Sequence, residues 1–552
     1  MRTLKTLLLC TSLFLTACAM HKSVRHLPDI SAFKQGIPSV TRHHSSLFSV
    51  DSNFLIKNEH QQWEIYISGD PLQRGFLFGV LLDSLLLKQE QVFFGKIKEI
   101  VPSENKQKRL RRFLQWYNRK LYLHVSNELQ AEIFGLSHFS NPAYDHIAPP
   151  FVRALYLHGA HDIGHALSDL ALVGCTSVAL WGEHTEDGEL LIGRNFDFYA
   201  GDEFAEEKVI AFVQPTKGIP FAMVTWPGML GVVSGMNLDG LTITINAGKS
   251  SVPLKAKKPI SILAREILQY CNTIDQAIAI ARKSDVFVSE SLMIGSAADK
   301  KSVLIEISPK KIDVYEVENN RLVCSNHFQS AKYAKDKRNI KHRRDSHSQY
   351  RFDRMTELLN LSPKMNPFLL AEILRNREGI QNSALGFGNE KALNQLLAHH
   401  SVIFKPESRI MWVSSSPYQL GAYTAYDLNE IFSSNRNHLK SNAIDSLLID
   451  KDPFQFSTAF LNYEAFRIVD RKVDEALKNK DGSFSVNDIV AYIALNPNYW
   501  VAHFKAGLLY EQASDFCNAK WAYERALQKE ITTVSDRENV KKALKRINKR
   551  IK

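Results

Sequence analysis

The amino-acid sequence predicts an α+β protein in which two β-sheets are covered by helices. From residue 175 onward, short segments rich in β-branched and aromatic residues are separated by Gly, Pro, Asp or Asn, a pattern typical of strands. These strands come in three groups separated by pairs of helical segments, so the order along the chain is strands, helices, strands, helices, strands. A length of 552 residues, of which 45% are hydrophobic, allows two to four compact units.

The first residues have the pattern of a secretory leader. Two basic residues precede an apolar run from Leu7 to Leu15, which is too short to span a bilayer permanently. Residues 1–17 end in a small-residue site and resemble a bacterial lipoprotein signal peptide, with Cys18 as the lipidated first residue. An ordinary signal peptide cut nearby is the alternative. Because Ala19 rather than an aspartate follows, we expect a lipid-anchored protein of the cell envelope, at the outer membrane and facing the periplasm or the surface.

Two segments precede the strand-rich region. Residues 18–60 are polar, rich in His, Ser and Lys, and are expected to form a tether. Residues 61–174 have a mainly helical pattern that opens at the turn Gly69-Asp70-Pro71. Gly75 and Gly79 lie four residues apart, so another element could approach this helix closely.

Residues 175–435 contain the alternating strands and helices. Strands are predicted at residues 175–181, 190–198, 208–214, 221–226, 241–245, 292–295, 302–307, 311–317, 321–324, 401–404 and 409–413. Helices are predicted at residues 259–271, 274–283, 351–360 and 368–375. The pair at 401–413 is expected to close this block.

The remainder, residues 440–552, is predicted to be helical. Within 496–529, five positions resemble one tetratricopeptide repeat: Gly507, Tyr510, Ala519, Tyr523 and Ala526. An amphipathic helical hairpin explains the same pattern, because such repeats usually need neighbours to bury their apolar faces. This module is the candidate surface for a protein partner.

Charge and cysteine usage exclude several functions. The formal net charge is +11, but basic and acidic residues are interspersed, which argues against nucleic-acid binding. The six cysteines, at 10, 18, 175, 271, 324 and 517, have neither metal-ligand spacing nor the pattern of a disulfide framework. We therefore expect no metal and no cofactor, and one cysteine present for its reactivity.

Cys175 is the candidate nucleophile. It follows Gly174, so its sulfur could reach the preceding carbonyl with little hindrance. If the strands on either side of the turn at 186–188 pair as a hairpin, Arg194 and Asp197 come to lie next to Cys175. A nearby guanidinium lowers a thiol pKa, and a carboxylate can orient the thiol or an amine. The alternative is a buried apolar cysteine.

These residues carry a family resemblance. Gly174-Cys175-Thr176-Ser177, together with Gly193-Arg194-Asn195-Phe196-Asp197-Phe198, resembles the cysteine N-terminal-nucleophile (Ntn) hydrolases. That class includes choloylglycine hydrolases, acid ceramidase-like amidases and, closest in pattern, the acyl-CoA:6-aminopenicillanic acid acyltransferase-like group called peptidase family C45. The resemblance covers about residues 65–430.

Three further stretches match the family in order. One ends at Asn246 and resembles the strand that carries an oxyanion-hole asparagine, although Asn237 is a rival because the spacing is one residue out of step. A second contains Asn326, which could instead cap a turn. A third contains Arg351, for which Arg354 offers the same charge one turn later.

The resemblance implies a four-layer αββα sandwich and a self-cleaving enzyme. Cys175 would attack the carbonyl of Gly174, and the α-amino group freed by the cut would then be the general base toward its own thiol. Asn246 would stabilise the oxyanion, and Arg194, Asp197, Asn326 and Arg351 would complete the site. The substrates would be N-acyl compounds cut at linear, non-peptide C–N bonds. Water gives a hydrolase and an amine gives an acyltransferase; an exported enzyme does not meet acyl-CoA, which favours hydrolysis.

Two other functions compete with this interpretation. His161-Asp162-x-x-His165 places two imidazoles four residues apart, near the zinc-protease pattern, but aspartate replaces the usual glutamate and Gly164 weakens the helix. Alternatively, the chain is a non-catalytic envelope lipoprotein whose C-terminal module recruits a partner.

Overall fold

The structure, a computed structural model, describes residues 22–159, 162, 174–199, 201–251, 255–362, 364–433 and 440–551. The leader, Cys18 and residues 160–173 apart from Asp162 lie outside the described residues. No helix in the described ranges is both long and apolar enough to cross a membrane.

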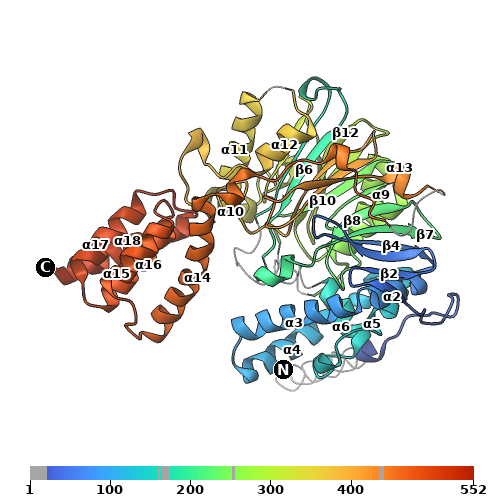
Figure 1. Ribbon diagram of the computed structural model, residues 1–552, viewed down its shortest axis with the longest axis horizontal. Helices are drawn as coiled ribbons and strands as arrows, with labels where there is room; N and C mark the ends of the chain where they lie inside the picture. The colour runs from blue at the N-terminus through green and yellow to red at the C-terminus, as the bar shows by residue number, and fades with distance from the viewer. Residues whose placement is uncertain are drawn as a thin grey trace, which may run out of the picture.

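The strands of these ranges form two sheets (Figure 1). The 11-stranded sheet has the order β1-β2-β3-β4-β7-β8-β9-β10-β11-β12-β13, and the 6-stranded sheet has the order β14-β5-β6-β15-β16-β17. The strands of the larger sheet are β1 Thr41–His44, β2 Leu47–Val50, β3 Asn53–Lys57, β4 Trp63–Gly69, β7 Val209–Pro215, β8 Phe221–Thr225, β9 Ser234–Asn237, β10 Leu241–Ala247, β11 Glu290–Ser296, β12 Lys301–Ile307 and β13 Ile312–Tyr315. Those of the smaller sheet are β5 Thr176–Leu180, β6 Leu191–Phe196, β14 Arg321–Cys324, β15 His400–Lys405, β16 Ile410–Ser414 and β17 Tyr423–Asp427.

The helices fall into three groups along the chain. The N-terminal group is α2 Pro71–Leu81, α3 Asp83–Ile100, α4 Glu104–Asn118, α5 Asn127–Ser137 and α6 Pro150–His158. The central helices are α8 Ile260–Tyr270, α9 Ile274–Lys283, α10 Lys337–Asp345, α11 Ser348–Leu361, α12 Pro367–Leu374 and α13 Leu428–Ile431. The C-terminal group, at one end of the molecule in Figure 1, is α14 Thr458–Asn479, α15 Val486–Leu495, α16 Trp500–Gln512, α17 Phe516–Leu527 and α18 Val534–Ile551.

The expected tether is wrong over residues 41–57. These residues form three antiparallel strands at the edge of the larger sheet, where all four residues of β1 are exposed while Phe54 and Leu55 of β3 are buried. A polar composition does not prevent strand formation at an edge, because an edge strand faces water. The expectation of mainly helical structure from residue 61 is likewise wrong at its start, since β4 pairs in parallel with β7.

The predicted helix start at Gly69-Asp70-Pro71 is present. The Asp70 side chain accepts a hydrogen bond from the backbone N–H of Gln73, and Pro71 occupies the first helical position. Gly75 faces α5 so closely that a Cβ there would lie 2.0 Å from the carbonyl oxygen of Glu132. The glycines thus permit the close helix crossing that their spacing predicted.

Most predicted elements of the core are present within a few residues of their expected ends. The pattern missed β9, α10 and α13, and it placed the end of the block one strand too early, because β17 follows β16 as an edge strand. Strand β9 has only four residues, two of them polar, and periodicity cannot identify so short a segment.

Buried side chains bring the two sheets together. One cluster joins residues of both sheets, among them Ile192 and Val402 from the smaller sheet and Phe212 and Met236 from the larger one. A second cluster packs the N-terminal helices and α8 against the larger sheet, and a third packs α11 and α12 against the smaller one. Residues between the two sheets are therefore shielded from water on both sides.

Candidate active site

The hairpin around residue 187 builds the centre of the site. Strand β5 pairs antiparallel with β6, with Thr176 opposite Asn195 and Ser177 opposite Arg194. The backbone N–H of Gly174 continues this ladder by donating to the carbonyl of Asp197 at 3.1 Å. The Cys175, Arg194 and Asp197 residues are brought together as the sequence predicted.

The Cys175 thiol is almost completely buried. Its Sγ lies 3.6 Å from Nη2 of Arg194. Burial raises the pKa of the thiol to about 11, and the guanidiniums of Arg194 and Arg351 only partly oppose this effect. Arg194 favours the thiolate as expected, but in the uncut chain desolvation outweighs this nearby charge, so the net pKa of the thiol is raised.

Arg194 links the smaller sheet to the larger one. One guanidinium nitrogen donates to the carbonyl of Val233 at 3.1 Å and to the Ser234 hydroxyl, and the other donates to the carbonyl of Ile245. The guanidinium carbon also lies 4.2 Å from the centre of the Phe196 ring. Because these contacts come from two sheets, the cation is held in one position beside the sulfur.

Asp197 is fully buried, and the pKa of its carboxyl lies close to neutral pH. Burial raises the pKa of Asp197 to about 7, against the lowering effect of Arg351 and Arg194. Its Oδ2 lies 3.4 Å from the side-chain nitrogen of Gln395, which also donates to the carbonyl of Gly174 at 2.7 Å. Its other oxygen has no hydrogen-bond partner among the residues that the structure describes.

Arg351, on α11, reaches the same centre from the opposite side of the smaller sheet. It donates at 2.6 Å to the carbonyl of Cys175, to the Thr176 hydroxyl and to Oδ1 of Asn326. Burial lowers the pKa of Arg351 to about 10, which leaves it charged at neutral pH. Arg354 points elsewhere and contacts Asn376, Asn382 and Glu357.

The candidate asparagines differ in their placement. Asn246, on β10, accepts a hydrogen bond from the Ser177 hydroxyl at 2.9 Å, two residues from Cys175. Asn326 adjoins the centre through Arg351 and donates to the carbonyl of Ala247 at 3.0 Å. Asn237 instead donates to the carbonyls of Leu268 and Cys271, so its amide ties β9 to the end of α8.

Sequence reasoning missed Gln395 and His347. No motif surrounds Gln395, which lies in the loop between α12 and β15 and reaches Gly174 across 221 positions of chain. His347 accepts from the guanidinium of Arg351 at 3.2 Å, and burial holds its pKa well below the usual range, so it is neutral. Its position four residues before Arg351 is the signal that could have identified it.

The alternative zinc motif is only partly described. His161 and His165 lie outside the described residues, while Asp162 caps the start of α8 by accepting from the backbone N–H of Ile260 at 2.7 Å. In the part of the chain that the structure describes, no group of three or more His, Cys, Asp or Glu side chains could hold a metal ion.

Comparison with known proteins addresses the same region. Residues 184–416 match the family model of acyl-coenzyme A:6-aminopenicillanic acid acyl-transferase. The predicted family resemblance is confirmed. The matched segment begins after Cys175 and contains Arg194, Asp197, Asn246, Asn326 and Arg351.

Similar proteins are found in several organisms. An uncharacterised protein of Archaeoglobus fulgidus is 27% identical over 157 residues, which cover 27% of this chain and 26% of the relative. The N-acylethanolamine-hydrolyzing acid amidase of Caenorhabditis elegans is 21% identical over 207 residues, which cover 36% of this chain and 56% of the relative. The chain thus spans between about a quarter and just over half of the length of these relatives. Among solved structures, penicillin V acylase from Agrobacterium tumefaciens is 17% identical, with a TM-score of 0.31, over 50% of this chain and 98% of that one.

Proposed function

We propose that this protein is an autoprocessing cysteine Ntn amidohydrolase that cleaves the C–N bond of N-acyl compounds. One observation carries the proposal: the Cys175 sulfur, the Arg194 and Arg351 guanidiniums and the Asp197 carboxyl meet in one buried centre at the residue before which the chain would be cut. The buried clusters support the four-layer αββα arrangement of that class, with helices on the outer face of each sheet.

Self-cleavage begins at the Gly174 carbonyl. The Cys175 sulfur adds to the carbonyl carbon, the C–N bond to Cys175 breaks, and the thiol proton passes to the leaving nitrogen. Water then hydrolyses the thioester, which leaves a carboxylate on Gly174 and a free thiol and amine on Cys175. The Asp197 carboxyl acts electrostatically on the Cys175 thiol, and its pKa of about 7 suits it to relay the proton.

The mature site uses the amine that the cut creates. An α-amino group has a reference pKa of about 8, so at neutral pH a fraction of it is free to accept the thiol proton. The thiolate attacks the acyl carbonyl of the substrate, Asn246 donates to the oxyanion, and Arg194 and Arg351 neutralise charge around the sulfur. Attack by water completes hydrolysis, and attack by an amine would complete acyl transfer.

Two features support an N-acyl amide as the substrate. The relative from C. elegans is named for hydrolysis of N-acylethanolamines. Close to the site, a mostly apolar cavity of about 50 Å³ is lined by Phe198, Phe204 and Trp226 together with Phe93 and Leu157 of the N-terminal helices, and Gln89 and Glu90 add polar groups to its wall. Phe198 follows Asp197 directly, so an apolar acyl group bound there would lie close to the nucleophile.

Location and partners form a second part of the proposal. The leader pattern and Cys18 support export and a lipid anchor at the outer membrane. In the C-terminal module, Gly507 lies against the Tyr523 ring, since a Cβ at Gly507 would meet it at 2.4 Å. This packing of α16 on α17 supports one tetratricopeptide-like unit that binds a protein partner.

Intact-mass spectrometry of the purified protein tests the proposed activity. We expect a fragment that begins at Cys175 in the wild type and an uncut chain in Cys175→Ala. Fatty-acyl amides incubated with the wild type should release free fatty acid, measured by liquid chromatography, and Cys175→Ala should release none.

Cys517→Ala is the matched control, because this cysteine is exposed in the C-terminal module and far along the chain from the site. It should be cut and active like the wild type. An uncut wild type, or a Cys175→Ala chain that is cut at the same bond, would disprove the mechanism.

A further inference from the structure

The amide of Gln395 lies on the bond that the proposed enzyme must cut. Gln395 is buried, and its side-chain nitrogen lies 2.7 Å from the carbonyl oxygen of Gly174 and 3.4 Å from Oδ2 of Asp197. A primary amide has two N–H groups, so one can face each oxygen. The carbonyl under attack and the carboxyl beside it are thus joined by one side chain.

Gly174 leaves room for this amide. A Cβ at residue 174 would lie 2.2 Å from the side-chain nitrogen of Gln395, closer than real atoms approach. Any other residue at 174 would push the amide away from the carbonyl. The requirement for glycine before Cys175 therefore has a second reason besides access of the sulfur.

The donor is placed where charge develops in the first step. When the Cys175 sulfur adds to the carbonyl carbon, the Gly174 oxygen becomes an oxyanion, and a donor already aimed at that oxygen stabilises the transition state. Asn246 does not serve this oxygen in the uncut chain, because its amide bonds the Ser177 hydroxyl and the carbonyl of Cys324. The two amides thus address different oxygens.

The loop that carries Gln395 is fixed from both sides. On the core side, Asn195 of β6 donates to the carbonyls of Leu374 and Leu393 at 2.8 and 2.9 Å. On the other side, Leu396 is buried in the cluster of the C-terminal helices, and the Tyr463 hydroxyl donates to its carbonyl at 3.2 Å.

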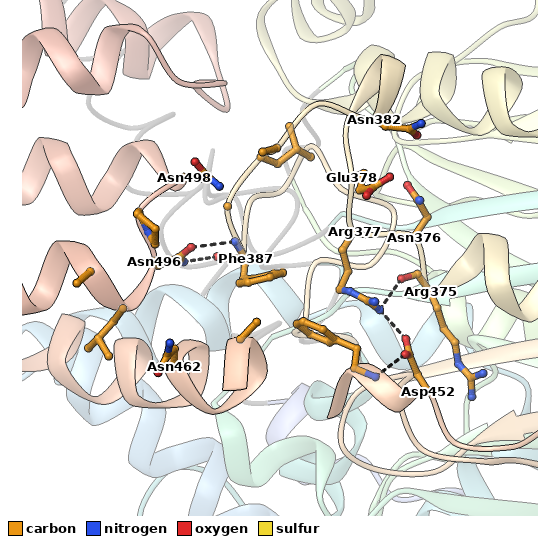
Figure 2. Close-up of a pocket in the computed structure, with 18 of the residues that line it drawn as sticks. Arg375, Asn376, Arg377, Glu378, Asn382, Phe387, Asp452, Asn462, Asn496 and Asn498 are labelled. Atoms are coloured by element: carbon orange, nitrogen blue, oxygen red, sulfur yellow. Dashed lines mark hydrogen bonds and ion pairs between the residues drawn. The ribbon is translucent and has the colours of Figure 1, made fainter. Parts of the chain in front are cut away.

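Figure 2 shows the earlier part of the same loop against the C-terminal module. Asn496 exchanges two hydrogen bonds with the backbone of Phe387 beside a cavity of about 730 Å³. Arg377, at the start of this loop, donates to the carboxylate of Asp452, which lies just before the C-terminal helices, at 2.5 Å. The helical module therefore holds the loop that presents Gln395.

We infer that Gln395 stabilises the oxyanion of Gly174 during self-cleavage, and that the C-terminal helical module holds its loop in place for this step. This inference rests on the proposed self-cleaving function. It assigns a catalytic residue to the cut itself and a positioning role to the module.

Gln395→Met tests the inference, because methionine has nearly the same length and volume but no N–H donor. We expect the fragment that begins at Cys175 to form about 10²-fold more slowly than in the wild type, the loss typical of one missing oxyanion donor. The cleaved fraction is followed by intact-mass spectrometry during pulse-labelled synthesis. Gln395→Glu, which places a second carboxylate beside Asp197, should be slower still.

Gln269→Met is the matched control, since Gln269 is equally buried and its amide donates to the carbonyl of Lys217 rather than lying near Gly174. It should be cut at the wild-type rate. Asn195→Ala, which removes the hydrogen bonds that hold the loop on the core side, should slow the cut. Asn195→Gln, which keeps an amide at this position, should be cut faster than Asn195→Ala but more slowly than the wild type.

The outcomes separate the two proposals. A wild type that is never cut refutes the proposed function itself. A wild type that is cut, with Gln395→Met cut at the same rate, refutes only the role of Gln395. If Gln395→Met is recovered unfolded, as judged by thermal melting, Gln395→Glu decides by the same comparison.

Discussion

At the scale of single residues, Arg351 holds the site together. Its guanidinium joins the Cys175 carbonyl, the Thr176 hydroxyl and the Asn326 amide, three groups from two separate parts of the chain. Lysine cannot reproduce this planar fork of donors. The position therefore requires arginine for geometry as well as for charge.

Arg351→Lys should lower the free energy of unfolding by about 2–4 kcal/mol, since at least one buried acceptor loses a charged partner. It should also reduce the cleaved fraction of the purified chain. Urea unfolding measures the first effect and intact mass measures the second.

Arg354→Lys separates stability from chemistry. Arg354 is equally buried three residues later, but its partners are Asn376, Asn382 and Glu357. We expect a loss of stability with an unchanged cleaved fraction. Equal losses of cleavage in both variants would contradict the distinction between the two arginines.

The pH dependence of self-cleavage should report Asp197. Its pKa is raised to about 7, so the carboxyl is protonated below that pH and ionised above it. Only the ionised form accepts a proton, so the rate should rise about tenfold per pH unit below 7 and level off above it. Protein made by cell-free synthesis and then transferred to buffers of different pH gives the profile of cleavage rate against pH. Asp197→Asn should remove the step, and an unchanged profile in that variant would exclude Asp197 as the relay.

At the scale of elements, the crossing of α2 and α5 depends on glycine. A Cβ at Gly75 would lie 2.0 Å from the backbone oxygen of Glu132, and one at Gly135 would lie 2.6 Å from that of Leu72. Backbone atoms cannot rotate away as side chains do. The helices would have to separate, which would disturb the buried ion pairs of Glu132 with Arg74 and Arg265.

Gly75→Ala should therefore lower the free energy of unfolding by about 1–3 kcal/mol, the usual range for overpacking. Gly95→Ala is the control, because this α3 glycine has no atom within 4 Å of an added Cβ. It should raise stability by about 0.5–1 kcal/mol through helix propensity. Urea unfolding compares the two, and equal effects would show that the crossing tolerates separation.

Local patterning explains which elements could be predicted. Every residue of β5 and β6 is buried, so these strands have no regular alternation of apolar and polar residues. Their β-branched and aromatic residues and the turn between them nevertheless identify them as strands. Strand β1, at the edge of the larger sheet, escaped prediction because all four of its residues are exposed and need not be apolar. Edge position is a property of the sheet that no local window contains.

At the scale of the whole molecule, a cut at Gly174 would not separate the fold. Strand β4, from the N-terminal fragment, pairs with β7 along its whole length. Glu132 and Arg265, from opposite sides of the cut, form a fully buried ion pair at 3.2 Å. The two fragments share one continuous core.

The cleaved protein should consequently elute from gel filtration as one species that contains both fragments, and denaturing electrophoresis should resolve two bands. Uncut Cys175→Ala should elute at the same volume. Elution of the fragment from 175 onward by itself would contradict the shared core.

The sequence by itself determined the hairpin of Cys175, Arg194 and Asp197, because these residues lie within one pair of adjacent strands and their spacing sets their registry. It also predicted the family resemblance and most helices of the core. Only the tertiary structure decided that Arg351 rather than Arg354 enters the site and that the Gln395 amide reaches the Gly174 carbonyl. It also decided that burial has a larger effect than Arg194 on the pKa of the Cys175 thiol. Those contacts join residues 176 and 221 positions apart, and only packing of the sheets, helices and C-terminal module brings them into reach.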